Sequence, residues 1–182
     1  MKTNIKFYTS YFYQIRNFKP WMIPISTAMW DPRWFHQFKT DNFTFQDKNG
    51  VVNGLRYTPF APGSNCENLC RGIDQCEDLN GRKADPTKCN FLKEYYKQLN
   101  NLDINNCIQD IIKIIKNSRF VNLQETKDKE TGIINYTVDG HYLEIVLIVF
   151  EVPANPCSER SSLIKWFNKN GIEMKELEYP IK

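Results

Sequence analysis

The segment from Tyr142 to Phe150 is the feature that most constrains how this chain can fold. Its last six residues, from Ile145 to Phe150, are continuously apolar. A strand with one face in water alternates apolar and polar residues, whereas a strand covered on both faces reads as a continuous apolar run. Strands of the second kind occur mainly in parallel sheets flanked by helices. The segment therefore predicts an α/β fold with this strand buried inside it.

Other segments rich in β-forming residues predict further strands. Residues 6–12 and 21–26 predict two strands near the start of the chain, and residues 172–177 predict a short closing strand. Pro24 lacks the N–H group that a sheet ladder uses. The strand over residues 21–26 is therefore expected either at an edge of the sheet or beginning only after Pro24.

The region after the second strand carries a helix signal and then a hairpin signal. Asp31 followed by Pro32 is typical of an N-cap and a first helical residue, and it predicts a short helix that includes Phe35 and Phe38. Residues 42–57 hold two β-forming stretches around a turn, which together predict a hairpin.

Three segments have apolar residues at helical spacing and a residue suited to capping the first turn. They span residues 85–99, 103–115 and 158–171. Asp103 or Asn105 is expected to cap the second helix, and Ser158 or Ser161 the third. Each helix is expected to pack one face on the sheet.

These elements predict a single α/β domain over residues 1–182, with three layers and a mainly parallel sheet flanked by helices. A polar, turn-rich stretch at 64–90 is expected to be a Cys-rich insertion, and the chain is expected to close with a strand–helix–strand unit. The polar segment 120–139, with Gly132 in its middle, predicts a hairpin or excursion from the domain.

Composition and charge exclude several classes of protein. Aromatic residues make up 14% of the chain and charged residues 25%, so neither a disordered nor a fibrous protein is expected. The net charge of +3 is far below the basic stripe of a dedicated duplex binder. The chain opens without a signal-peptide pattern and its longest apolar run is too short to cross a bilayer, so an unprocessed cytoplasmic protein with no membrane partner is expected.

The insertion holds four of the six cysteines in the chain. They are Cys66, Cys70, Cys76 and Cys89. Four thiolates suit a tetrahedral structural zinc ion, which would staple a loop that has almost no core of its own. The spacing lacks a paired Cys-x2-Cys knuckle, so an iron–sulfur cluster and free or disulfide-bonded cysteines stay as alternatives. His36 and His141 are the sole histidines, and metal sites built on histidine are not expected.

A candidate ligand site follows the apolar strand. Glu151 ends that strand, and residues 157–162 lead into a helix whose free N–H groups and positive dipole end attract anions. In open α/β sheets, ligands bind beyond the carboxyl ends of the strands. The candidate catalytic residues are Glu151, Cys157 and Arg160. The candidate ligand-binding residues beside them are Ser158, Glu159, Ser161 and Ser162.

Hydroxyl groups at the ends of the first two strands are expected at the same edge of the sheet. Thr9 and Ser10 end the first strand, and Ser26 ends the second. Parallel strands bring their carboxyl ends together, so these hydroxyls are candidates for contacting a polar ligand such as a nucleotide or a base. Trp30 and Trp34 lie close by in the sequence and are suited to stacking on a ring or to packing in the core.

The same residues also have a purely structural interpretation. Glu159 and Arg160 would then be solvated charges, the serines would be helix caps, and Glu151 would pair with Arg160. Cys157 at a helix N-terminus is placed for thiolate stabilisation and hence for nucleophilic chemistry. A phosphatase-like loop, however, would carry glycines and a more distant arginine, and neither is present.

Several short motifs together resemble the domain of unknown function 488 family, in the form common in bacteria and their phages. They are Tyr8-Thr-Ser-Tyr-Phe12, Ile23-Pro-Ile-Ser26, Tyr57 leading to Ala61-Pro62, and Leu147 to Glu151 with Pro153 and Cys157. The resemblance implies a compact α/β fold. Many relatives carry Glu, a Pro-containing spacer and then Cys-His-Arg before the last helix. Glu151 and Cys157 match that pattern, whereas Ser158-Glu159-Arg160 replaces His-Arg, which argues against any mechanism that needs the histidine.

Two functional hypotheses follow. The favoured one is binding of a nucleotide or nucleic-acid-derived anion at residues 157–162, with Glu151 as acid, base or orienting group, in an enzyme or a binding protein. The competing one is a non-catalytic, metal-stapled interaction module of a phage or mobile element. That module would engage its partner through the Cys-rich insertion and residues 120–139.

Overall fold

The computed structural model describes residues 3–37, 52–67, 69, 85–118, 121–151, 156–179 and 181. Six strands form one sheet in the order β3-β4-β2-β8-β1-β9, and every neighbouring pair among these described strands is parallel. The strands are β1 (Lys6–Tyr11), β2 (Met22–Ser26), β3 (Phe35–Gln37), β4 (Val52–Arg56), β8 (Glu144–Val149) and β9 (Met174–Glu176). The predicted α/β fold with a mainly parallel sheet is confirmed.

Strand β8 is the apolar segment from which the prediction began. It pairs with β1 on one side and β2 on the other, so that Leu147 lies between Thr9 and Ile25. Residues 145–149 are fully buried, as the continuous apolar run predicted. The chain continues from β8 through helix α4 (Glu159–Lys169) into β9, which pairs with the far side of β1. This is the expected strand–helix–strand unit.

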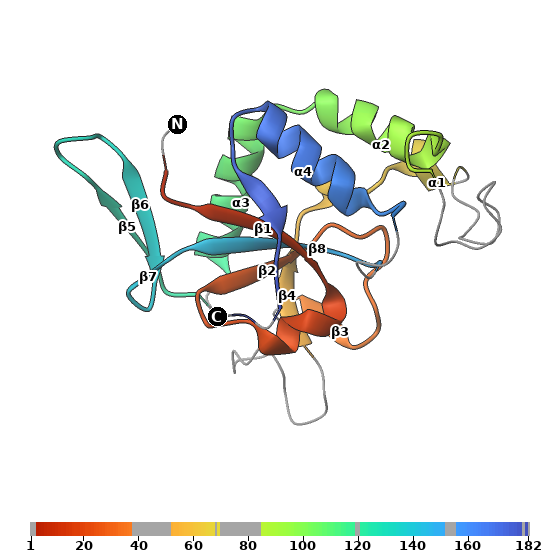
Figure 1. The fold of residues 1–182 in the computed structure, drawn as a ribbon. Helices are drawn as coiled ribbons and strands as arrows, with labels where there is room; N and C mark the ends of the chain where they lie inside the picture. Colours follow the sequence, from red (N-terminus) through yellow and green to blue (C-terminus); the bar gives the residue numbers. More distant parts are fainter. Residues whose placement is uncertain are drawn as a thin grey trace.

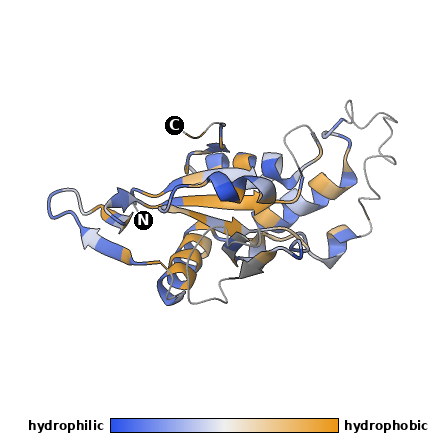
Figure 2. Ribbon diagram, turned by 90° about the horizontal axis from the view of Figure 1, so that it is seen from below, coloured by the Kyte–Doolittle hydropathy of each residue, from blue (hydrophilic) through white to orange (hydrophobic). Residues whose placement is uncertain are grey.

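One face of the sheet is covered by the long helices. Buried residues of α2 (Asn90–Asn100), α3 (Ile104–Asn117) and α4 share one core cluster with alternate strand residues such as Phe7, Ile25 and Leu147. Within the described residues, the opposite face is covered without an α-helix. There the short 3-10 helix η1 (Phe12–Asn17) packs on Val146 and Ile148, together with aromatic residues from the loop before β3 and from the end of the chain. Figure 2 shows the hydrophobic strands in the middle of the molecule.

Two of the predicted helix starts are confirmed by their caps. The Asp103 side chain accepts a hydrogen bond from the backbone N–H of Asn106 and caps α3, and Ser158 caps α4 through the N–H of Arg160. The start predicted at Asp85 is wrong, because α2 begins at Asn90. The Asp85 carboxylate instead accepts hydrogen bonds from Thr87 and closes a separate turn ahead of the helix.

Pro24 lies in an interior strand, so both expectations for it, an edge position or a strand start after it, are wrong. The C=O of Trp21 accepts from Glu144 and the N–H of Thr27 donates to Ile148, so odd-numbered positions of β2 hydrogen-bond to β8. Even-numbered positions, Pro24 among them, face β4, where pairing begins only at Ile25. The missing N–H therefore removes no ladder bond, because a parallel strand alternates the neighbour that it bonds.

The helix predicted through Phe35 is also wrong, because residues 35–37 form strand β3 beside β4. The Phe35 ring packs edge-on against Phe12 of η1 at a centroid distance of 5.0 Å. This tertiary packing outweighs the local capping signal. Phe38 and the first strand of the hairpin predicted over 42–57 lie outside the described residues, and β4 pairs in parallel with β2 and β3.

A second, antiparallel sheet projects from the end of the domain where β8 begins (Figure 1). It contains β5 (Leu123–Lys127), β6 (Ile134–Val138) and β7 (His141–Tyr142) in that order. The β5–β6 pairing confirms a hairpin within residues 120–139, and Gly132 in its turn has a φ of 67°, which suits glycine.

Two short helices complete the described chain, namely η2 (Thr58–Phe60) and α1 (Ser64–Glu67). Of the predicted Cys-rich insertion, the structure describes residues 64–67, 69 and 85–90. In the described part of the chain, no helix is both long and apolar enough to span a bilayer.

Gly54 provides a test of the packing between β4 and its neighbours. A Cβ atom at this position would lie 2.7 Å from the Phe35 ring and 2.8 Å from the Pro24 carbonyl oxygen. Gly54→Ala is therefore expected to lower the free energy of unfolding by about 1–3 kcal/mol, as overpacking does. Urea unfolding measures the effect. Gly63→Ala is the control, because its Cβ would meet only the flexible Gln98 amide, at 3.2 Å. Equal losses in the two variants would contradict this packing.

Candidate functional site

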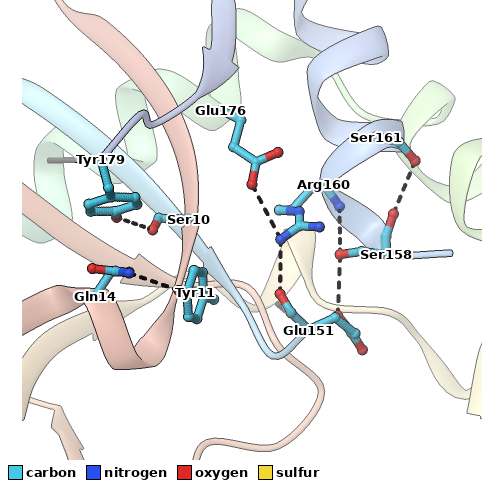
Figure 3. A network of polar contacts seen from close by, with 9 residues as sticks. All are labelled: Ser10, Tyr11, Gln14, Glu151, Ser158, Arg160, Ser161, Glu176 and Tyr179. Carbon is cyan, nitrogen blue, oxygen red and sulfur yellow. Dashed lines mark hydrogen bonds and ion pairs between the residues drawn. The ribbon is translucent and has the colours of Figure 1, made fainter. Parts of the chain in front are cut away.

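The loop after β8 and the first turn of α4 are joined by short polar contacts (Figure 3). The Ser158 hydroxyl donates to Glu151 Oε2 at 3.3 Å and accepts from the backbone N–H of Arg160 at 3.4 Å. Ser158 thus caps the helix and holds the Glu151 carboxylate at the helix start. The structure brings together Glu151, Ser158 and Arg160 as the sequence predicted.

Arg160 lies at the centre of this group and is buried. Its Nη1 donates to the Glu151 main-chain oxygen at 3.0 Å and lies 3.5 Å from Glu176 Oε1. Glu176 is the last residue of β9, so the guanidinium links β8, α4 and β9 (Figure 3). The alternative in which Arg160 is a solvated charge is wrong.

Glu159 is buried as well, with 6% of its surface exposed. Burial, together with a hydrogen bond to Glu151 and the charge of that residue, raises the pKa of Glu159 well above its usual range, although Arg160 acts in the opposite direction. The neighbouring Glu151 carboxylate and burial thus make Glu159 hold its proton to a higher pH than an isolated glutamate does.

Two buried polar atoms of this group have no hydrogen-bond partner, and they are Glu159 Oε2 and Thr9 Oγ1. Thr9 is paired in register with Leu147 and with Glu176, so its side chain lies on the helix-covered face beside the ion pair of Glu176 with Arg160. A buried polar atom left unsatisfied costs about 1–3 kcal/mol. Atoms of this kind at the carboxyl edge of a sheet are therefore candidates for contacting a ligand.

Ser10 and Ser26 reach the expected edge but lie on the other face of the sheet. The Ser10 hydroxyl hydrogen-bonds to the Tyr179 hydroxyl at 2.5 Å, and Figure 3 shows this pair away from Arg160. The Ser26 hydroxyl donates to Asp31. Successive residues of a strand point to opposite faces, so Thr9 and Ser10 cannot contact the same ligand from one side.

The remaining candidates in this loop contribute mainly to the local structure. The Ser161 hydroxyl donates to the Ser158 carbonyl at 3.0 Å, and Ser162 is buried in the first turns of α4. Cys157 is partly buried and packs against the larger core cluster, where a thiol behaves as a small apolar group. Ser158 is thus a helix cap and Ser161 a turn residue, as the purely structural interpretation of these serines predicted.

Glu176 is the site residue that the sequence analysis missed. The signal was present, because β9 was predicted as a closing strand, and a parallel strand beside β1 brings its own carboxyl end to the same edge. His141, in contrast, lies at the opposite end as expected, stacked on Trp21 with ring centroids 3.7 Å apart.

A cavity of about 650 Å³ also lies at that opposite end of the sheet. Ile5, Phe7 and Ile172 line it together with Lys6 and Lys175, from β1 and the start of β9. No sequence pattern indicated this cavity, because segments far apart in the chain form its walls.

The predicted zinc ligands are described only in part. Cys66 lies in α1, and Cys89 occupies the N-cap position of α2 without a side-chain cap hydrogen bond. The two helices pack together, whereas Cys70 and Cys76 lie outside the described residues. Burial raises the pKa of the Cys66 thiol, and the charges of Glu94 and Glu159 act in the same direction. Within the described ranges, no group of three or more His, Cys, Asp or Glu side chains is arranged to hold a metal. The described cysteines form no disulfide, and the zinc site stays a prediction.

No protein-family model, curated protein or solved structure matches this chain. The resemblance to the domain of unknown function 488 family therefore stays a prediction based on its short motifs.

The raised pKa of Glu159 predicts how stability depends on pH. Unfolded Glu159 ionises above about pH 4.5, whereas the folded carboxyl ionises at a higher pH, so the folded state binds more protons between these two values. The free energy of unfolding should then fall with rising pH, by at most about 1.4 kcal/mol per pH unit, until the pH passes the raised pKa. Glu159→Gln should remove this component of the slope.

Urea unfolding between pH 5 and pH 8 measures both slopes. Glu130→Gln is the matched control, because Glu130 is exposed in the β5–β6 turn and should keep the wild-type slope. Identical slopes for wild type and Glu159→Gln would show that Glu159 is ionised in the folded protein.

Metal analysis tests the zinc prediction. Protein purified without chelator is expected to hold zinc in a 1:1 ratio to the chain, and Cys89→Ser should lower that content, while serine keeps a residue suited to capping α2. Cys107→Ser is the control, because Cys107 is packed in the core through α3. A metal-free wild-type protein whose thiols all titrate would contradict the zinc site.

Proposed function

We propose that this protein binds a nucleotide or a nucleic-acid-derived anion at the carboxyl edge of its sheet. In this proposal the carboxyl pair of Glu151 and Glu159 exchanges a proton with the ligand, in a cytoplasmic enzyme or binding protein. The observation that carries the proposal is Glu159 itself, a buried carboxyl with one oxygen unpaired. It lies in the first turn of a helix, directly before a buried arginine.

The start of α4 is suited to attracting an anion. The first turn of α4 presents backbone N–H groups and the positive end of the helix dipole. Arg160 adds a full positive charge, and the Glu176 carboxylate lies 3.5 Å from its guanidinium. That carboxylate is 40% exposed, so an incoming phosphate or carboxylate can take its place on the guanidinium. Glu176 is thus an internal anion in the position that the ligand would occupy.

Glu151 and Glu159 are suited to proton transfer. A general acid works best when its pKa is near the operating pH, and burial beside another carboxylate moves Glu159 in that direction. Glu151 is the natural acceptor, because it already hydrogen-bonds to Glu159 and to the Ser158 hydroxyl. Two carboxyls with different environments can therefore act as donor and acceptor in one reaction.

The competing function, a metal-stapled interaction module of a phage or mobile element, is favoured by a different observation. The β5–β6–β7 sheet projects from the body of the domain, and most side chains of β5 are exposed (Figure 1). A projecting hairpin of this kind is suited to contacting another protein. It lies at the end of the sheet away from Arg160, so the two functions can be tested separately.

Charge removal at Glu176 tests the anion site. Glu176→Gln is expected to tighten the binding of adenosine 5′-monophosphate and of inorganic phosphate by about fivefold, since loss of a partly exposed ion pair is worth about 1 kcal/mol. Arg160→Lys should weaken both by at least about tenfold, because lysine cannot form the bidentate contact. Isothermal titration calorimetry measures the affinities, with circular dichroism to confirm folding.

The matched control is Glu178→Gln, which removes the same charge two residues further along, from an exposed side chain. It should change the affinities by less than about twofold. Equal effects of Glu176→Gln and Glu178→Gln, or the absence of binding of either probe to the folded wild type, would contradict the proposed anion site.

A further inference from the structure

Exposed aromatic side chains gather at the carboxyl edge of the sheet. Five large hydrophobic residues are exposed among the described residues, and three of them follow the ends of neighbouring strands. Trp30 follows β2, Phe150 follows β8 and Tyr13 follows β1, in the order in which these strands lie side by side. Neighbouring strands are about 4.8 Å apart, so the segments that carry the three rings leave the sheet at successive positions along one edge.

The turn that carries Trp30 is held in place, although the Trp30 ring is in water. It is 73% exposed, yet it lies in a turn that returns to the end of β2. Arg56 Nη2 donates to the carbonyls of Ala28 and Met29, at 2.9 Å each, and Nη1 pairs with Asp31 at 2.8 Å. Asp31 in turn accepts from Ser26.

These contacts fix a turn whose tip presents a tryptophan to solvent. Burial of apolar surface does not explain why a tryptophan lies at this position, because the ring itself is not buried. Exposed aromatic residues on a fixed backbone are typical of recognition surfaces, because less backbone entropy is lost on binding.

Phe150 and Tyr13 extend the same surface. Phe150 is 62% exposed and contacts the buried ring of Phe12 at a centroid distance of 6.3 Å, so one side of it is supported by the core. Tyr13 is 57% exposed and carries the Arg16 guanidinium over its ring at 4.0 Å. The Phe150 ring is therefore supported by the core and the Tyr13 ring by Arg16, while the Trp30 ring is carried by a turn with a fixed backbone.

The charges around these rings favour an anionic partner. Arg16 lies on the Tyr13 ring, and Arg33 is exposed three residues after Trp30. The nearby acids are already engaged, because Asp31 pairs with Arg56 and Glu151 is hydrogen-bonded by Ser158. Aromatic rings interleaved with arginine form the usual platform for single-stranded nucleic acid, on which each base stacks on a ring.

We infer that Trp30, Phe150 and Tyr13 form a stacking surface for the bases of a single-stranded nucleic acid, one phosphate of which contacts the start of α4. The inference rests on the proposed anion site for that phosphate contact and narrows its ligand class. A protein partner or a second copy of the chain is a different occupant of the same surface, and the experiment separates these cases.

Fluorescence anisotropy with a labelled twelve-nucleotide oligothymidylate tests the inference. Wild-type protein is expected to bind it at low salt, and Trp30→Ala and Phe150→Ala should each weaken binding by about fivefold to 150-fold, as loss of one stacked base does. Both side chains are exposed, so their removal should leave folding intact. Tyr142→Ala is the matched control, because Tyr142 is 51% exposed at the other end of the sheet, and it should bind as wild type does.

Three outcomes would overturn the inference. Oligonucleotide binding that is unchanged in both Trp30→Ala and Phe150→Ala would show that the rings take no part. Equal weakening of inorganic polyphosphate and oligothymidylate by these variants would show a purely electrostatic effect. A wild-type dimer in sedimentation that Trp30→Ala dissociates would show that the surface contacts a second copy of the chain.

The failure of this inference can be distinguished from that of the proposed anion site. Binding of adenosine 5′-monophosphate without any binding of oligothymidylate contradicts the stacking surface alone. Oligothymidylate binding that depends on Trp30 but is unchanged by Glu176→Gln and Arg160→Lys contradicts the anion site and its phosphate contact, because only the aromatic residues would then be needed.

Discussion

The burial of β8 on both faces is the constraint on which the rest of the structure depends. Five consecutive residues of this strand are fully buried between β1 and β2, so each side of the sheet must be covered along its whole length. The long helices cover one side, and η1 with the loop before β3 covers the other. A strand buried in this way ends where the cover ends, and its last residues turn abruptly from the core to the surface. The polar site lies at that point.

Arg160 connects the loop after β8, the start of α4 and the end of β9, which are not joined by backbone pairing. One guanidinium nitrogen contacts the loop after β8 and the end of β9, while the arginine itself belongs to α4. The ion pair between Arg160 and Glu176 is partly exposed, so it contributes little net stability, but its geometry is specific. We therefore interpret the ion pair between Arg160 and Glu176 as an element that orients the edge. In the proposed function, the partial exposure of Glu176 would also give a ligand access to Arg160.

Helix caps that depend on neighbouring residues were predictable from the sequence. Features that depend on contacts between distant segments were not. The caps at Asp103 and Ser158 depend on neighbouring residues, and both were predicted. Pro24 is tolerated inside the sheet because of which neighbouring strand each peptide group of β2 bonds to. No local sequence pattern indicates that choice. Phe35 is in a strand because of its contact with Phe12, a residue far earlier in the chain. Glu176 was missed because its partner, Arg160, lies on a different element.

The last two residues of the β8 segment explain how one ligand could contact both parts of the edge. Phe150 faces the aromatic residues around Phe12, and Glu151 faces Ser158 and Arg160, because successive residues point to opposite faces. A purely apolar or purely anionic ligand would use one face and leave the other in water. A nucleotide unit has a flat ring and a phosphate separated by a sugar, so it can lie across the end of the strand with each part against the matching face. The alternation that separates Ser10 from Thr9 thus favours a ligand with two chemically different ends.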